Sequence, residues 1–172
     1  DLLFHWTGDA RFLHALVLLT ALLILVIGGR ITPTFTANWL RMQGLDPESV
    51  VSRPWLDRAG LVATLVLVVL EAGAWKVPAL TGTVALLAAL LVLARLVIWS
   101  GWQPAREPLL WLLHAGHLWV AIGFLLRSLA AFSLVPDSAW LHALGAGAMG
   151  TMILAVMTRV AVGHTGRPLR LR

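Results

Sequence analysis

The sequence contains no cysteine and no tyrosine, and it has few charged residues. Without cysteine the chain can form no disulfide, bind no metal through a thiolate and hold no c-type haem. Without tyrosine it can carry no tyrosyl radical. Charged residues make up 12% of the chain and hydrophobic residues 59%, whereas soluble domains have about 25% charged and about 45–50% apolar residues. The composition therefore excludes an ordinary water-soluble domain and indicates an integral membrane protein.

Five long hydrophobic runs dominate the chain. A membrane-spanning helix needs roughly 20 apolar residues, whereas a spanning strand would show polar alternation over about 9–11 residues. The runs therefore predict an all-α fold, a polytopic bundle of five spanning helices that forms one transmembrane domain over residues 1–172. The predicted helices cover residues 12–31, 54–75, 79–102, 108–132 and 138–162.

Turn-forming residues mark the ends of the first run. Gly28 and Gly29 are expected to end the first helix, because paired glycines are typical of a helix end. Residues 32–53 are then expected to form an interfacial loop. Within this loop Asp46 and Pro47 are typical of a helix start and predict a short surface helix.

Positive charge is unevenly divided between the two ends of the predicted bundle. Ten of the thirteen lysine and arginine residues fall at one end and three at the other. Because cytoplasmic loops carry an excess of Lys and Arg, the C-terminus is expected in the cytoplasm and the N-terminus outside. The positive charges do not gather on one face, so nucleic acid is not an expected partner.

Five of the six histidines lie within or close to predicted helices, where polar side chains usually face a bundle interior, a cavity or a cofactor. His14 and His142 lie at matched depth near the outer ends of two helices. They could share one metal ion, or each could hydrogen-bond to water or lipid headgroups. His114 and His117 share a face of the fourth helix, roughly 9 and 13 Å inside the membrane. A haem, a metal ion or an interhelical hydrogen bond would satisfy them.

The fifth predicted helix combines a histidine with glycine and methionine. At an α-helical period, His142, Gly145, Met149 and Met152 fall on one stripe. Small residues there would let another helix or a flat macrocycle approach the backbone closely, and ordinary helix packing would use them equally well. The methionines are either packing residues or copper ligands.

Arginines end two of the predicted helices on the cytoplasmic side. Arg30 and Arg159 could pair with haem propionates, or they could reach lipid headgroups. His164 and Arg167 follow the fifth helix in a turn that could close the edge of a cofactor or bind a lipid phosphate.

Several segments resemble motifs of the NnrS family. Residues 28–36, GGRITPTFT, resemble the family's GGR-I-x-P-x-FT segment, and residues 111–114 resemble its W-x-L-H. Residues 142–152 are similar to its HALxxGAMGxM stretch, and residues 156–168 are similar to its VMTR…GHTGRP ending. The resemblance extends over most of the chain.

NnrS-family members are multi-pass bacterial membrane proteins that contain haem and copper and are associated with nitric oxide and denitrification. The resemblance therefore implies haem b and copper as cofactors and the bacterial inner membrane as the location. Family members are usually longer, so the chain is similar to their C-terminal half, and an N-terminal half or a partner membrane chain is expected.

The resemblance also implies a set of site residues. The candidate ligands are His114, His142 and His164, and the candidate propionate or structural partners are Arg30, Arg159 and Arg167. The roles of His14 and His117 rest on their depth in the membrane alone. The metal candidates are His14, His114 and His142.

The expected function is the handling of nitric oxide or iron–nitrosyl species, or electron transfer in that context. Whether the chain is catalytic stays open. One alternative is a b-type cytochrome subunit that passes electrons from quinol within a respiratory complex. A second is a cofactor-free transporter or structural subunit, in which the histidines only form hydrogen bonds between helices.

Overall fold

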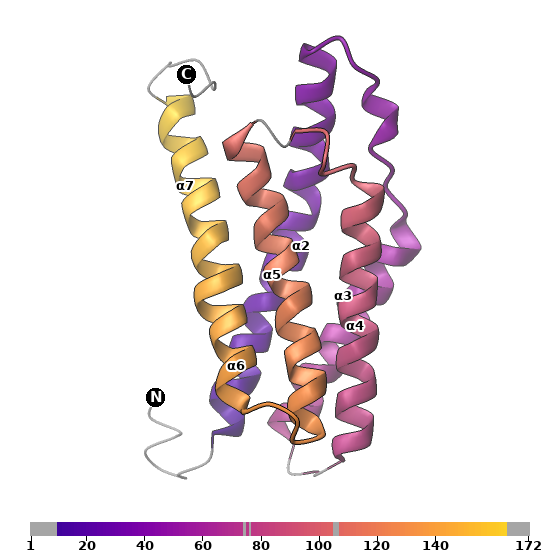
Figure 1. Ribbon diagram of the computed structural model, residues 1–172, viewed down its shortest axis with the longest axis vertical. Helices are drawn as coiled ribbons and strands as arrows, with labels where there is room; N and C mark the ends of the chain where they lie inside the picture. Colours follow the sequence, from indigo (N-terminus) through magenta and orange to yellow (C-terminus); the bar gives the residue numbers. More distant parts are fainter. Residues whose placement is uncertain (1–9, 74, 76, 105–106, 165–172) are drawn as a thin grey trace.

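The computed structural model describes residues 10–73, 75, 77–104 and 107–164. Within these residues it contains helices and no strand. Figure 1 shows long helical rods lying side by side along the longest axis of the molecule. The all-α prediction is therefore confirmed.

The bundle consists of five rods. Four of them are long and apolar enough to cross a membrane. The remaining rod, α3, carries three charged residues among its 19 residues. The rods are α2 (Arg11–Met42), α3 (Pro54–Ala72), α4 (Pro78–Ile98), α5 (Pro108–Ala131) and the continuous series α6 (Asp137–His142), η2 (Ala143–Gly150) and α7 (Thr151–His164). Helices α3, α4 and α5 each begin with a proline, which suits the first turn because that position needs no hydrogen-bonded N–H.

Helix α2 continues to Met42, well past Ile31, where the sequence predicted its end. The prediction of a loop over residues 32–53 is therefore wrong for its first half. Pro33 lies inside the helix and removes one backbone hydrogen bond. Membrane helices tolerate such a proline when hydroxyl side chains and neighbouring helices satisfy the freed groups.

Threonines next to the proline hydrogen-bond to other carbonyls of the same helix. The Thr34 hydroxyl donates to the Arg30 carbonyl at 2.8 Å, and the Thr36 hydroxyl donates to the Thr32 carbonyl at 2.9 Å. Thr32 and Thr36 are also fully buried against the other helices. Tertiary packing therefore keeps this part of the chain helical.

The connection from α2 to α3 contains the short surface helix that the sequence predicted. It is a single 3-10 turn, η1 (Pro47–Ser49), and the Asp46 carboxylate caps it by accepting from the Glu48 N–H at 2.9 Å. The Ser49 carbonyl accepts a hydrogen bond from the Ser100 hydroxyl at 2.9 Å. This bond ties the connection to the end of α4.

Helix α5 occupies the middle of the bundle. It contacts α2, α4 and the rod formed by α6, η2 and α7 (Figure 1). Its buried face includes both of its histidines. The two histidines of α5, His114 and His117, therefore lie in the interior of the bundle.

Residues 143–150 form a π-helix, where the sequence predicted an uninterrupted α-helix over residues 138–162. A π-helical segment changes the angular position of every side chain that follows it. Met149 is accordingly 39% exposed, while Met152 is 7% exposed and faces the interior. The predicted stripe of His142, Met149 and Met152 is therefore broken.

Candidate functional site

His117 lies fully buried on α5 with one ring nitrogen unpaired. Its Nδ1–H donates to the Leu113 carbonyl at 2.9 Å, so Nε2 is the nitrogen that keeps its lone pair. Nε2 is buried and has no hydrogen-bond partner among the described residues. A histidine whose other nitrogen is fixed by a carbonyl in this way is oriented as metal-ligating histidines commonly are.

Gly28 of α2 faces this free nitrogen. A Cβ atom on Gly28 would stand 3.0 Å from His117 Nε2 and 2.8 Å from Met152 Cε. Only glycine therefore fits without moving the imidazole or the methionine. The paired glycines that suggested a helix end in the sequence instead make room for side chains from other helices.

Gly29, the second of this pair, lies against the guanidinium of Arg95 on α4. A Cβ atom on Gly29 would collide with Arg95 Nη2. Arg95 is 2% exposed, and its Nε lies 2.8 Å from Asp57 Oδ1 on α3. The Arg95 Cζ also lies 4.8 Å from the ring centroid of Trp99. An ion pair between a buried guanidinium and a partly exposed carboxylate therefore joins α3 and α4 beside α2.

Trp99 connects this ion pair to both histidines of α5. Its ring lies edge-on to His117, with centroids 5.0 Å apart, and to His114, with centroids 6.5 Å apart. The sequence analysis did not single out Arg95 or Trp99 as neighbours of the histidines, because no sequence pattern reports which helices face each other.

His114 makes an interhelical hydrogen bond, one of the outcomes expected from its depth. Its Nε2 lies 3.0 Å from the Thr36 hydroxyl, which itself donates to the Thr32 carbonyl. The imidazole Nε2–H therefore donates to Thr36, and Nδ1 keeps its lone pair. Nδ1 is buried without a hydrogen-bond partner in the described part of the chain, and it faces Gly101.

An apolar cleft of about 490 Å³ lies beside His114, between α4 and α5. Trp102 and Trp111 line it together with Gly101 and His114. The His114 side chain is 7% exposed, so the imidazole reaches the edge of this cleft while remaining buried.

His142 lies at the surface of the bundle, on α6. Its Nδ1–H donates to the Ser138 carbonyl at 2.6 Å, which leaves Nε2 with its lone pair. The side chain lines a cleft of about 440 Å³ with Trp119, Gly147 and several alanines. A Cβ atom on Gly147 would stand 2.6 Å from the Trp119 ring, so glycine lets the indole pack directly on η2.

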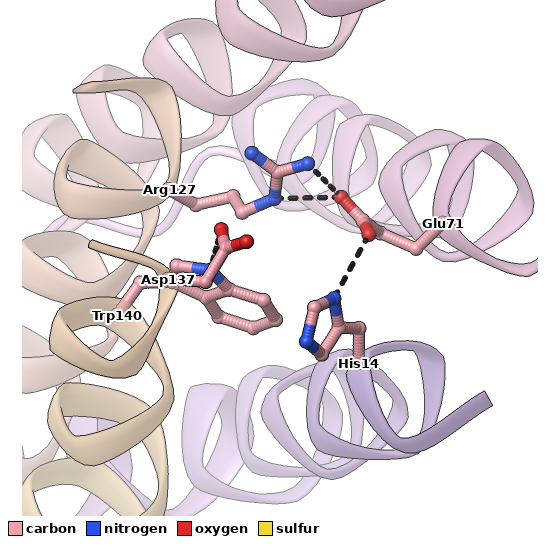
Figure 2. A network of polar contacts seen from close by, with 5 residues as sticks. All are labelled: His14, Glu71, Arg127, Asp137 and Trp140. Carbon is pink, nitrogen blue, oxygen red and sulfur yellow. Dashed lines mark hydrogen bonds and ion pairs between the residues drawn. The ribbon is translucent and has the colours of Figure 1, made fainter. Parts of the chain in front are cut away.

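His14 and His142 line separate clefts, so the structure does not bring together the metal pair suggested by their depth. The His14 Nδ1 lies 3.5 Å from Glu71 Oε2. Glu71 Oε1 accepts from Arg127 Nε at 2.6 Å and also contacts Arg127 Nη2. Figure 2 shows these side chains converging from α2, α3 and α5. The partner of His14 is therefore a carboxylate and not a second imidazole.

The sequence family described as NnrS protein matches residues 1–172. This chain belongs to the NnrS family. No curated protein and no solved structure matches it. The resemblance read from the sequence motifs is therefore confirmed, and NnrS membership together with the apolar helices identifies a membrane protein related to nitric oxide.

Three segments that carry the NnrS resemblance meet in the interior of the bundle. Residues 28–36 supply Gly28, Gly29 and Thr36, residues 111–114 supply His114, and residues 142–152 supply Met152. The contacts described above bring these residues to the same region, around His114 and His117. This region is the candidate functional site of the NnrS chain.

Two of the arginines predicted to bind propionates, Arg30 and Arg159, have different surroundings. Arg30 is exposed and lines a cleft of about 230 Å³ together with Asp57. Arg159 lies with its Cζ 3.9 Å from the ring centroid of Phe35, which is a cation–π contact. The side chain of His164, and Arg167 as a whole, lie outside the described residues.

Among the residues that the structure describes, no three His, Asp or Glu side chains gather closely enough to hold a metal ion together. The metal candidates His14, His114 and His142 line three separate clefts. In the described part of the chain, His114 and His117 each have one ring nitrogen hydrogen-bonded to a protein oxygen and one buried ring nitrogen without a partner.

Proposed function

We propose that this NnrS chain is a haem- and copper-binding membrane protein that handles nitric oxide or iron–nitrosyl species, or transfers electrons in that context. The supporting observation is the set of three imidazoles, His114, His117 and His142, that each keep one ring nitrogen with no hydrogen bond to any described residue. Two of these nitrogens are buried in a bundle interior, where an unpaired polar atom is unfavourable unless a ligand satisfies it.

His142 fits the requirements of a haem ligand best. Its Nε2 belongs to a side chain at an open cleft, whose lining includes three alanines, Ala139, Ala143 and Ala146. His114 is the second candidate, because it reaches an apolar cleft lined by two tryptophans. Haem iron supplies the site at which nitric oxide binds directly, and the protein supplies ligation, access and tuning of the potential.

The proposal includes a location and an orientation. The arginine-rich end of the bundle faces the cytoplasm of a bacterial inner membrane, with the C-terminus inside. Exposed apolar side chains cover the outer faces of the rods, which suits contact with lipid or with a further membrane chain.

An absorption spectrum of the purified full chain, with and without nitric oxide, tests the proposed function. We expect a haem Soret band that shifts when nitric oxide is added, and copper in a metal analysis of the same sample. A low-spin haem spectrum that does not change when nitric oxide is added would instead favour a b-type cytochrome subunit. Protein without any Soret band would favour a cofactor-free transporter or structural subunit, and either result would overturn the proposal.

A further inference from the structure

A cleft of about 230 Å³ lies between α2, α3 and α4, and three arginines line it, Arg30, Arg58 and Arg95. We call it the arginine cleft. Asp57 is the acidic residue in its lining among those that the structure describes, so the described side chains around the cleft carry an excess of two positive charges. A hollow with such an excess attracts anions.

Arg95 contributes a buried guanidinium that Asp57 does not saturate. The side chain is 2% exposed, and its Nε lies 2.8 Å from Asp57 Oδ1. Its Nη1 is buried and has no hydrogen-bond partner within the described residues. A guanidinium has five N–H donors, and a buried donor without an acceptor is unfavourable. An anion with several oxygens would supply the acceptors that Asp57 leaves missing.

Arg30 and Arg58 bring two further guanidiniums to the cleft, from α2 and α3. Both side chains are exposed, and no ion pair or hydrogen bond joins either guanidinium to a residue that the structure describes. The planar guanidinium binds phosphate or carboxylate oxygens through paired hydrogen bonds. These two side chains can therefore contact an anion beside Arg95 without breaking an existing bond.

The first turn of α3 borders the same cleft. Its first residue, Pro54, lines the cleft, and the side chain of its N-cap residue, Arg53, makes no capping hydrogen bond. The N-terminus of a helix carries a partial positive charge and N–H groups that favour anions. Helix α3 therefore adds to the positive potential of the three guanidiniums.

The cleft lies at the depth expected for phospholipid headgroups. Arg11 and Arg30 are nineteen residues apart on α2, which corresponds to roughly 28 Å of helix, and the hydrocarbon core of a bilayer is about 30 Å thick. Toward the middle of the membrane the lining changes to the apolar residues Leu25, Val26 and Leu61. Basic pockets between membrane helices at this depth are typical binding sites for the headgroups of anionic lipids.

We propose that the arginine cleft binds the phosphate group of an anionic phospholipid from the surrounding bilayer. The guanidiniums donate to the phosphate oxygens, and the acyl chains follow exposed apolar side chains of α2 and α3, such as Val26 and Val62. The proposal concerns a lipid site and requires neither the haem nor the copper of the proposed function.

Native mass spectrometry of the purified full chain in detergent, titrated with phosphatidylglycerol, tests the site. We expect one lipid molecule to bind more tightly than the rest, because the cleft offers one cluster of guanidiniums. Arg30→Gln and Arg58→Gln should each lower the affinity for this molecule about fivefold, and the two substitutions together should lower it about tenfold or more. An affinity that stays unchanged in the double variant would overturn the proposal.

Arg41→Gln is the matched control for the loss of one positive charge. Arg41 is an exposed arginine nearer the end of α2, and it donates to Asn38 Oδ1 at 2.8 Å. It is not among the described residues that line the cleft. We expect this variant to bind phosphatidylglycerol as the wild type does. Equal losses in Arg41→Gln and Arg30→Gln would show that binding follows the overall charge and not the cleft.

Arg95→Lys tests the buried guanidinium itself. Lysine keeps a positive charge beside Asp57 but lacks the planar fork that pairs with phosphate, so we expect weaker binding of phosphatidylglycerol than in the wild type. Thermal unfolding in the same detergent shows whether the variant is folded. If it is not folded, the Arg30 and Arg58 variants still decide the question, because they change exposed side chains.

Inorganic phosphate and haem content separate the other possible occupants of the cleft. Inorganic phosphate has no acyl chains, so it should not displace phosphatidylglycerol at the same concentration. Displacement at equal concentration would show that the cleft holds a free anion. A double variant that loses haem but keeps its affinity for phosphatidylglycerol would show that the cleft holds a haem propionate. Either result would overturn the proposal.

Discussion

Gly28 on α2 faces His117 on α5 so closely that any side chain at this position would enter the space beside the imidazole Nε2. We therefore expect Gly28→Ala to destabilise the protein, although alanine generally favours a helix over glycine. The added methyl would stand 2.8 Å from both His117 Cε1 and Met152 Cε, and such overpacking costs about 1–3 kcal/mol. Thermal unfolding in detergent measures the change.

Gly60→Ala on α3 is the control for this substitution. The nearest atom to its new Cβ would be Leu91 Cβ at 3.9 Å, which is ordinary van der Waals contact. The variant should be as stable as the wild type or slightly more stable. Equal effects of the two substitutions would contradict a special role for the contact between Gly28 and His117.

The ion pair between Asp57 and Arg95 gives a second prediction. Asp57→Asn leaves the buried guanidinium of Arg95 without its counter-charge, and because the Asp57 side chain is 29% exposed we expect a loss of stability below the about 3–5 kcal/mol of a fully buried pair. The double variant Asp57→Asn with Arg95→Met should recover part of this loss, because it removes the uncompensated charge as well. A double-mutant cycle of unfolding free energies measures the coupling. Additive effects would show that the two side chains are independent.

Haem content distinguishes the two histidines near the outer end of the bundle. We expect His142→Ala to lower haem occupancy, because His142 has a free Nε2 at an open cleft. His14→Ala should leave haem occupancy unchanged, because His14 lies in another cleft beside Glu71. The pyridine haemochrome assay on matched preparations gives both values. Equal losses, or no loss in either variant, would remove His142 as the haem ligand.

The orientation in the membrane gives a fourth prediction. Five consecutive rods place the start of α2 and the end of α7 at opposite ends of the bundle (Figure 1). The uneven distribution of arginine then predicts a periplasmic N-terminus and a cytoplasmic C-terminus. Reporter fusions at both termini test this arrangement, and a cytoplasmic N-terminal reporter would refute it.

The sequence predicted the fold class and the starts of helices well, because hydrophobic runs and prolines act locally. Pro54 and Pro108 mark helix starts in both the sequence and the structure. The continuation of α2 through Pro33 was missed, because the local signals for a helix end are outweighed there by burial of Thr32 and Thr36. Local sequence patterns do not include contacts between helices, and the helical conformation of residues 32–42 depends on such contacts.

The sequence predicted only part of the candidate site, because local patterns do not show which helices contact one another. The depth of His114 and His117 in an apolar helix indicated that they need partners, and His114 indeed bonds to Thr36. The pairing of Arg95 with Asp57 could not be read from the sequence, because it depends on how α3 and α4 are placed in space. The break in the stripe around Met152 follows from the π-helical geometry of η2, which a regular helical period does not anticipate.

The geometry of η2 also makes the length of this segment critical. A π-helix holds more residues per turn than the 3.6 of an α-helix, so each residue of η2 turns the chain by less than the about 100° of an α-helix. Met152 lies beyond this segment, so the length of η2 determines whether its side chain faces Gly116 of α5. The number of residues in η2 thus determines the direction in which side chains of α7, such as that of Met152, point.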